Sequence, residues 1–153
     1  MGVSGIILKK REDIDIDHLI NDINLAANRA GLEITMDEKV YSKTRKEFKY
    51  VTFNIFDSGR KQDILLYLFN VSEYDYDEEF DWIAPGDKLV HIINIEDFDT
   101  CEKLMLDFIY EYLSINRKDI FWDEQDWFYD YDSIKRIKSK EFDNECCYKP
   151  FIG

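Results

Sequence analysis

The sequence predicts an α+β fold: a mostly antiparallel sheet of about four to five strands, two main helices packed on it, and an irregular, aromatic-rich C-terminal segment. Three observations support this fold class. Two stretches place apolar residues at helical spacing, several short runs are rich in β-branched and aromatic residues, and turn residues separate those runs. With 153 residues, of which 45% are apolar and 16% aromatic, the chain is predicted to form a single domain over residues 1–153 rather than a disordered chain.

The first predicted elements are a strand and a helix. A short apolar run favours a strand at residues 5–10, and apolar residues recur at helical spacing over residues 16–30. Gly31 can adopt the left-handed conformation that often ends a helix. The positive end of a helix dipole also suits the acids that crowd the start of this stretch, which are Asp13, Asp15 and Asp17.

Strands are predicted to dominate the middle of the chain. Residues 50–56 and 64–71 are rich in β-branched and aromatic side chains, and a turn around Gly59 separates them. We expect these two runs to pair as an antiparallel hairpin. The second run is apolar on both faces, which is typical of a central strand. Residues 89–95 are predicted to form a further strand.

Two more helices are predicted in the second half of the chain. Apolar residues at helical spacing favour a helix at residues 98–114, with Asp97 or Asp99 as its N-cap and Glu102 completing a capping box. A shorter helix is expected at residues 132–139. No repeat or linker-like stretch interrupts this order, which agrees with one domain.

The negative charge is concentrated in the middle of the chain. The 33 acidic and 20 basic residues give a net charge of −13, but residues 62–134 alone carry −16 and the rest of the chain carries +3. An acidic surface repels phosphate backbones and attracts cationic proteins. Direct nucleic-acid binding is therefore disfavoured, and a basic protein partner is favoured.

Two clusters in this region combine carboxylates with aromatic rings. Residues 73–82 contain six acids and four aromatic residues, residues 119–132 contain six of each, and neither cluster contains a base. Tyrosine and tryptophan dominate interface hot spots, and carboxylates steer cationic partners, so we interpret the clusters as a partner-binding surface. The residues assigned to this surface are Tyr74, Asp75, Tyr76, Asp77, Glu78, Glu79, Asp81, Trp82, Asp119, Trp122, Asp123, Glu124, Asp126, Trp127 and Asp130.

A second interpretation of the same clusters stays open at this point. Their aromatic side chains could fill the core while their acids form a solvated face, and the sequence does not decide which cluster is interface and which is core. The three tryptophans, Trp82, Trp122 and Trp127, show why this matters. Removing a core tryptophan would unfold the chain rather than only weaken binding.

The sequence contains no recognised catalytic or cofactor motif. Nucleophile-elbow, Walker A, dinucleotide-binding and zinc-protease patterns are all absent from it. His91 lies within an apolar strand, where a buried or edge histidine is common. His18 lies in the first turn of a helix, where we expect it to be exposed. Residues 13–17 begin like a calcium loop, but His18 replaces the glycine and Asn24 the glutamate of that motif. We therefore expect no enzymatic activity, no cofactor and no metal.

The N-terminus and the cysteines suggest a soluble, cytoplasmic protein. No stretch approaches the roughly 20 apolar residues of a membrane span, and basic residues follow the first apolar run instead of preceding it as in a signal peptide. The three cysteines, Cys101, Cys146 and Cys147, fit reduced thiols better than a disulfide framework. Whether the adjacent pair has a role is left open.

One segment near the end joins the aromatic–acidic pattern to a short amphipathic run. Residues 121–129 read Phe-Trp-Asp-Glu-Gln-Asp-Trp-Phe-Tyr, and Ile134-Lys135-Arg136-Ile137 follows. As the ending of a small acidic α+β chain, this segment resembles the immunity proteins of bacterial toxin–immunity systems, including contact-dependent inhibition. The resemblance implies a small cytoplasmic protein that neutralises a cognate toxin domain, often a basic nuclease. It transfers no specific contact residue.

The leading hypothesis is a non-enzymatic inhibitor that occludes a basic partner, most simply an immunity protein for a nuclease-type toxin. Its carboxylates would occupy the phosphate-binding sites of the toxin, while tryptophan and tyrosine supply apolar contact. The alternatives are a phage-type DNA mimic that inhibits a DNA-binding protein, an enzyme built on a carboxylate pair, and a structural or adaptor domain. The identity and activity of the partner and the oligomeric state are left open by the sequence.

Overall fold

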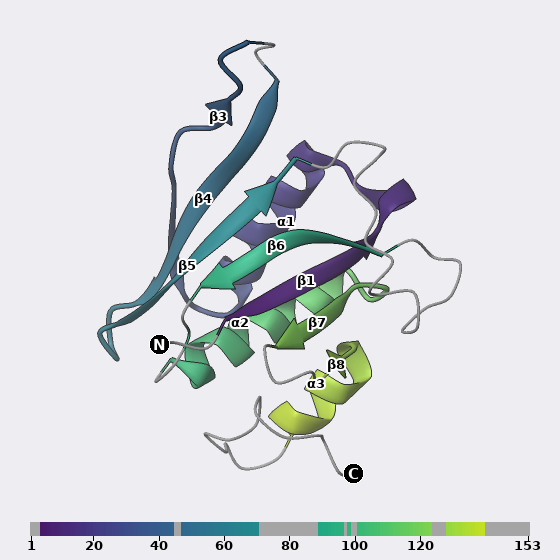
Figure 1. Cartoon of the computed structure of the whole chain (residues 1–153). Helices are drawn as coiled ribbons and strands as arrows, with labels where there is room; N and C mark the ends of the chain where they lie inside the picture. The colour runs from purple at the N-terminus through teal and green to yellow at the C-terminus, as the bar shows by residue number, and fades with distance from the viewer. Residues whose placement is uncertain are drawn as a thin grey trace.

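The computed structural model describes residues 4–44, 47–70, 89–96, 98, 101–123 and 128–139. Over these residues the chain forms one antiparallel sheet and three α-helices, which confirms the α+β class (Figure 1). The sheet has eight strands, so the expectation of about four to five was too low. Its strands are β1 (Gly5–Lys10), β2 (Glu33–Met36), β3 (Val40–Tyr41), β4 (Phe48–Asp57), β5 (Gln62–Phe69), β6 (Leu89–Glu96), β7 (Ile120–Asp123) and β8 (Phe128–Tyr129).

The sheet follows the order β2-β4-β5-β6-β1-β7-β8, with β3 also paired to β4. The predicted hairpin is present, because β4 and β5 pair from Tyr50 opposite Phe69 to Asp57 opposite Gln62. Its turn is held by the Asp57 carboxylate, which accepts the backbone N–H of Gly59 at 3.0 Å. The first strand, β1, lies between β6 and β7, so the N-terminal strand is central in the sheet.

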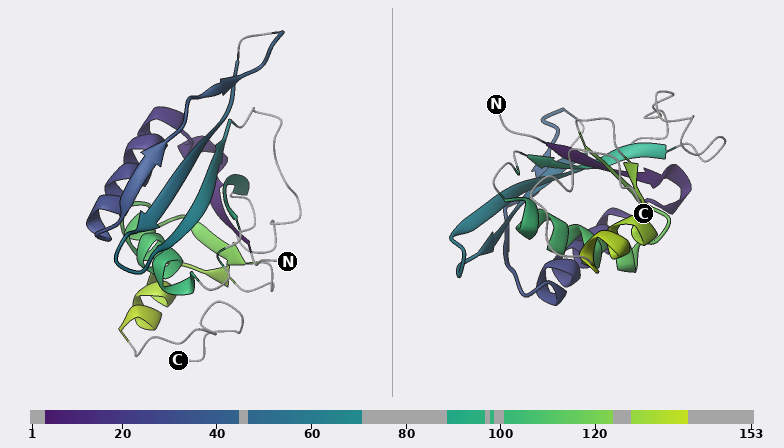
Figure 2. Two further views of the ribbon diagram at one scale, coloured as in Figure 1. Left: turned by 90° about the vertical axis from the view of Figure 1, so that its left-hand side faces the viewer. Right: turned by 90° about the horizontal axis from the view of Figure 1, so that it is seen from below.

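All three helices lie on the same face of the sheet (Figure 2). They are α1 (Ile16–Arg29), α2 (Glu102–Ile115) and α3 (Tyr131–Lys138), and a short 3-10 turn, Arg11–Asp13, joins β1 to α1. Helix α1 packs beside both α2 and β2, and α3 packs on α2. No helix of the described residues is long and apolar enough to cross a membrane.

The ends of α1 match the sequence prediction. The Asp15 carboxylate is the N-cap and accepts the backbone N–H of His18 at 3.1 Å. At the other end Gly31 has φ +73°, and the N–H of Leu32 donates to the carbonyl of Ala27 at 2.9 Å. This is a Schellman motif, which satisfies carbonyl groups that the last helical turn would otherwise leave unpaired.

The start of α2 and the C-terminal segment differ from the prediction. Helix α2 begins at Glu102 rather than at residue 98, and its N-cap residue, Cys101, makes no side-chain capping hydrogen bond. The proposed caps Asp97 and Asp99 lie outside the described residues. The segment expected to be irregular contains β7 and β8, whose four and two residues are too short to produce a recognisable period of alternation.

The main core lies between the helices and the sheet. Alternate residues in the middle of β4 and β5 face it and are at most 2% exposed: Val51, Phe53, Ile55, Ile64, Leu66 and Leu68. The opposite sheet face carries a smaller apolar cluster around Leu8 and Leu89, with Ile6, Ile120, Trp122 and Phe128 packed against it. Strand β1 therefore sends Ile7 into the main core and Leu8 to the other face, and the next residue, Lys9, returns to the helix side.

Candidate functional site

The first acid–aromatic cluster, residues 73–82, lies outside the described residues. It belongs to the stretch of sequence between β5 and β6. The partner contacts assigned to it remain predictions from the sequence: Tyr74, Asp75, Tyr76, Asp77, Glu78, Glu79, Asp81 and Trp82.

Two carboxylates of the second cluster, residues 119–132, lie inside the protein. Asp119, just before β7, is 2% exposed, and Asp123, at the end of β7, is 0% exposed. Asp123 lies opposite Gly5 of β1, on the same side of β7 as the core residue Phe121. Neither carboxylate lies on the surface, so in this structure neither offers the partner contact that the sequence analysis assigned to it.

Other members of the second cluster lie nearer the surface. Trp122 is half-buried on the sheet face opposite the helices, where its ring stacks on that of Phe128 with centroids 5.7 Å apart. Asp130 is exposed and caps α3 by accepting the N–H of Ser133 at 2.9 Å. The remaining predicted contacts, Glu124, Asp126 and Trp127, lie outside the described residues.

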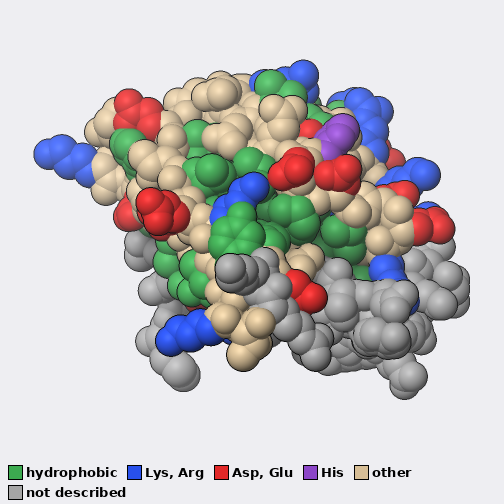
Figure 3. All heavy atoms as spheres, turned by 90° about the horizontal axis from the view of Figure 1, so that it is seen from above, with side chains coloured by type: hydrophobic (Ala, Val, Ile, Leu, Met, Phe, Trp, Pro, Cys, Tyr) green, Lys and Arg blue, Asp and Glu red, His purple; other side chains and the backbone are tan. Residues whose placement is uncertain are grey.

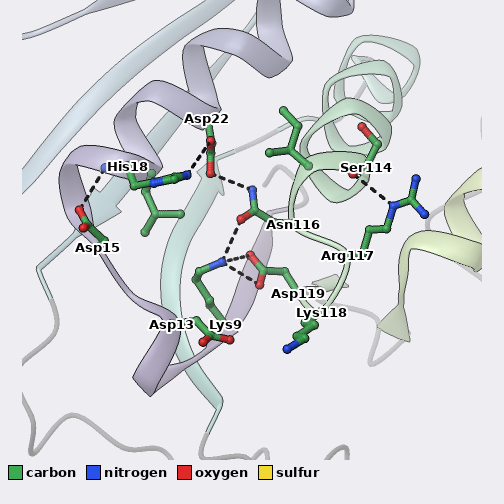
Figure 4. Close-up of a pocket in the computed structure, with 12 residues that line it drawn as sticks. Lys9, Asp13, Asp15, His18, Asp22, Ser114, Asn116, Arg117, Lys118 and Asp119 are labelled. Carbon is green, nitrogen blue, oxygen red and sulfur yellow. Dashed lines mark hydrogen bonds and ion pairs between the residues drawn. The ribbon is translucent and has the colours of Figure 1, made fainter.

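A cavity of about 560 Å³ opens between the start of α1 and the end of α2 (Figure 4). Asp13, Asp15 and His18 line one side, and Arg117 and Lys118 line the other. Pockets that hold small molecules have volumes in the range of about 300–1,000 Å³, so this one is large enough for a small ligand.

The floor of the cavity is a chain of polar side chains that ties β1, α1 and α2 together. The Lys9 ammonium donates to Asp119 Oδ1 at 3.1 Å and to Asn116 Oδ1 at 3.0 Å. The Asn116 amide in turn donates to Asp22 Oδ2 at 3.2 Å, and the Tyr112 hydroxyl donates to Asp119 Oδ2 at 2.8 Å. These groups satisfy one another in a largely buried place, which is how proteins tolerate buried polar atoms.

Burial changes the acidity of two groups in this network. It raises the pKa of the Asp119 carboxyl to about 6, although the charge of Lys9 and the hydrogen bond from Tyr112 oppose the rise. Burial and the neighbouring carboxylate also raise the pKa of the Tyr112 hydroxyl well above its ordinary value. Tyr112 thus keeps its proton at neutral pH, while Asp119 titrates in mildly acidic solution.

The two histidines lie where the sequence analysis expected. The His18 side chain is 73% exposed at the rim of the cavity, and its Nε2 lies 3.6 Å from Oδ1 of the buried Asp22. His91 is half-buried on β6, and the His91 and Phe69 rings meet edge to face with centroids 5.7 Å apart. Within the described parts of the chain, no group of three or more His, Cys, Asp and Glu side chains is placed to hold a metal ion.

Sequence reasoning missed the polar network. It placed Asp119 among the partner contacts and did not connect Lys9, Asp22, Tyr112 or Asn116 with it. One local signal was present, since His18 and Asp22 are four residues apart and therefore share a helix face. The contact between Lys9 and Asp119 joins residues 110 positions apart, and no sequence pattern reports such a pairing.

The described residues hold only a small part of the excess negative charge. They contain 19 acids and 15 bases, a net of −4, so nine of the thirteen excess negative charges belong to residues outside them. On the face that Figure 3 shows, acidic and basic side chains are interspersed among exposed hydrophobic ones. The strongly acidic character of the chain therefore resides mainly in segments such as residues 73–82.

Comparison with known proteins found no match for this chain among family models, curated proteins or solved structures.

Proposed function

We propose that this chain is a non-enzymatic binding protein that inhibits a basic partner by covering it, as an immunity protein does for a nuclease-type toxin. The observation that carries the proposal is the net charge of −16 over residues 62–134, a region that contains the two clusters of acids and aromatic rings. Carboxylates speed the approach of a cationic partner, and aromatic side chains supply the buried contact that holds it.

The hydrogen bonds within the polar network favour a binding protein over an enzyme. The inner carboxylates of the cavity, Asp22 and Asp119, are engaged by Asn116, Lys9 and Tyr112 in a set of contacts that fastens β1 and the two longer helices. Such a network stabilises a scaffold. A catalytic acid or base, in contrast, must reach a substrate within hydrogen-bond distance.

The described part of the second cluster supports an interface near the edge of the sheet. Strands β7 and β8 pair through Trp122 opposite Phe128, at the end of the strand order. The residues that connect these two strands in the sequence include Glu124, Asp126 and Trp127. The proposed surface therefore combines the stacked Trp122 and Phe128 rings with acids and an aromatic residue adjacent in sequence.

The test begins with the gene next to the one that encodes this chain, because toxin and immunity genes lie side by side in the family that the sequence resembles. The two products are co-expressed, the complex is isolated, and the purified partner's nuclease activity is titrated with this protein. We expect inhibition at one molar equivalent. A neighbour that encodes no toxin, together with a capture experiment that recovers no cationic protein, would refute the proposal.

Variants then locate the interface. Triple reversal of Asp75, Asp77 and Glu78 to Lys, or double reversal of Glu124 and Asp126 to Lys, is expected to weaken inhibition by about tenfold or more. The matched control reverses three acids that are exposed in the structure, Glu12, Glu33 and Glu38. Equal inhibition by all four proteins would show that the acid–aromatic clusters are not the interface.

A further inference from the structure

Three basic side chains from separate segments of the chain meet at one carboxylate of α2. Arg60 lies in the turn between β4 and β5, Lys103 in the first turn of α2, and Lys138 at the end of α3. Figure 2 shows these three segments close together. The carboxylate is that of Asp107, and we refer to Arg60, Lys103 and Lys138 as the cation cluster.

Two ammonium groups of the cation cluster share a single oxygen atom. The Lys103 ammonium donates to Asp107 Oδ1, and the Lys138 ammonium lies 3.2 Å from the same oxygen. The other oxygen, Asp107 Oδ2, lies 3.7 Å from Nη2 of Arg60. Like charges held this near one another repel, and a single carboxylate offsets only part of that repulsion.

Positive charges outnumber negative ones in this cluster. Within the described parts of the chain its three cations form ion pairs with two carboxylates, because Arg60 Nε also lies 3.4 Å from Oδ2 of Asp57. Three positive and two negative charges leave a net charge of +1. A chain with 33 acids and 20 bases would be expected to surround its bases with acids. The excess positive charge therefore favours an additional anion at this place.

The three cations are accessible to a ligand in solution. Their side chains are 41% exposed for Arg60, 35% for Lys103 and 28% for Lys138, whereas that of Asp107 is only 12% exposed. A guanidinium has five N–H donors and an ammonium three, so each cation keeps donors that its contacts with carboxylates do not use. The Lys138 ammonium also lies over the Tyr110 ring, 4.8 Å from its centroid, which orients this side chain.

We propose that Arg60, Lys103 and Lys138 bind the phosphate group of a small phosphorylated ligand. A phosphate monoester carries about −1.5 to −2 charges near pH 7 and has three strong acceptor oxygens, so each cation can donate to a different oxygen. A carboxylate has one charge and two oxygens and suits three donors less well. A long polyanion such as nucleic acid is disfavoured, because each further phosphate meets the repulsion of a chain with a net charge of −13.

The first test is an NMR titration of the full ¹⁵N-labelled chain with inorganic phosphate at pH 7.5, with sodium chloride used to hold the ionic strength constant. We expect saturable shifts of the amide signals that flank Arg60, Lys103 and Lys138. Sulfate should compete for the same site, and acetate should bind more weakly. Shifts that do not saturate, that spread evenly over the chain, or that chloride alone reproduces would overturn the inference.

Variants of the lysines test whether these cations hold the phosphate. Lys103→Met and Lys138→Met are each expected to weaken phosphate affinity by about tenfold or more, because each removes a charged donor. The matched control is Lys135→Met, which removes the same charge from an exposed position of α3 that makes no ion pair with Asp107. It should stay within about twofold of the wild type. Equal phosphate affinity of Lys135→Met and Lys138→Met would contradict the proposal, and melting temperatures without phosphate show that each variant is folded.

Asp107→Asn tests the same site in the opposite direction. It removes the negative charge that an incoming phosphate must approach, so phosphate is expected to bind this variant more tightly than the wild type. Unchanged or weaker binding by the folded variant would contradict a phosphate site at these cations.

A titration with adenosine 5′-monophosphate identifies the source of the phosphate group. Tighter binding than that of inorganic phosphate would support a nucleotide, and equal binding would support recognition of the phosphate group alone. The inference does not rest on the proposed function, since every titration is made without the toxin partner and its failure leaves that proposal unchanged.

Discussion

At the scale of single residues, the buried pair of Lys9 and Asp119 is the most informative feature of the structure. Lys9 is 7% and Asp119 2% exposed, so burial removes both charges from water. Their mutual attraction offsets this loss of hydration only while both charges are present. The raised pKa of Asp119 shows that burial outweighs the attraction of Lys9. The pair therefore contributes to stability only while both the Lys9 ammonium and the Asp119 carboxylate are present.

Removing one partner tests this condition. Lys9→Met leaves a buried carboxylate without its cation and is expected to lower the free energy of unfolding at pH 7 by roughly 3–5 kcal/mol, whereas Lys9→Met/Asp119→Leu recovers most of that loss. Urea denaturation measures both. The exposed Lys118→Met is the control and should change stability by less than about 0.5 kcal/mol. A third variant, Lys9→Met/Asp119→Asn, keeps an acceptor for the Tyr112 hydroxyl. If both double variants are as unstable as Lys9→Met, the unpaired charge is not the cause of the loss.

The titration of Asp119 predicts a pH dependence. Its pKa rises from 3.8 to about 6 on folding, so its contribution to stability is fully present below pH 4 and is lost as pH rises through about 6. Between pH 4 and 7 the wild type is expected to lose roughly 2–3 kcal/mol relative to Asp119→Asn, which has no carboxyl to titrate there. Unfolding free energies measured across this range should converge or cross, and parallel curves would contradict the assignment.

At the scale of elements, length decided what the sequence could predict. Helix α1 and the β4–β5 hairpin are long enough for their periods of 3.6 and 2 to be counted, and Gly31 and Asp15 mark the ends of α1 through local chemistry. Strands β2, β3, β7 and β8 have four residues or fewer, and their sheet positions depend on partners distant in sequence. The burial of Asp119 and Asp123 could not be predicted either, because it depends on the same distant partners and both residues belong to an acidic stretch of sequence.

The end of α1 supplies a test of that local chemistry. Gly31 has φ +73°, and a methyl group there would meet no atom within 4 Å, so Gly31→Ala introduces conformational strain without a steric clash. We expect a loss of roughly 1–2 kcal/mol in the free energy of unfolding. Gly31→Asn should lose less, because asparagine tolerates the left-handed conformation. Equal stability of wild type and Gly31→Ala would mean that α1 ends differently in solution.

Gly5 of β1 contrasts with Gly31, because a side chain there would collide with a packed neighbour. A Cβ on Gly5 would lie 2.5 Å from Cε1 of Phe121, a core side chain of β7. Gly5→Ala is therefore expected to cost about 1–3 kcal/mol by overpacking, and the additional change Phe121→Leu should recover part of that loss. A calorimetric melting series on the single and double variants measures this coupling, and purely additive losses would show that the two sites do not touch.

At the scale of the whole molecule, charge is distributed unevenly along the chain. The residues that the structure describes carry a net charge of only −4, whereas residues 62–134 of the full sequence carry −16. Concentrating like charges in this way destabilises the folded chain through self-repulsion. In the proposed function a cationic partner would relieve that repulsion, which links the composition of the chain to its proposed role as an inhibitor.

The most direct test of that role is the salt dependence of the association rate with the partner encoded by the neighbouring gene. Stopped-flow measurements are expected to show fast association of the wild type, with a rate that falls steeply as ionic strength rises. The variant with Asp75, Asp77 and Glu78 changed to Lys should associate more slowly and respond less to salt, while the Glu12, Glu33 and Glu38 control stays closer to wild type. Association that is slow and indifferent to salt in all three proteins would contradict an acidic binding surface.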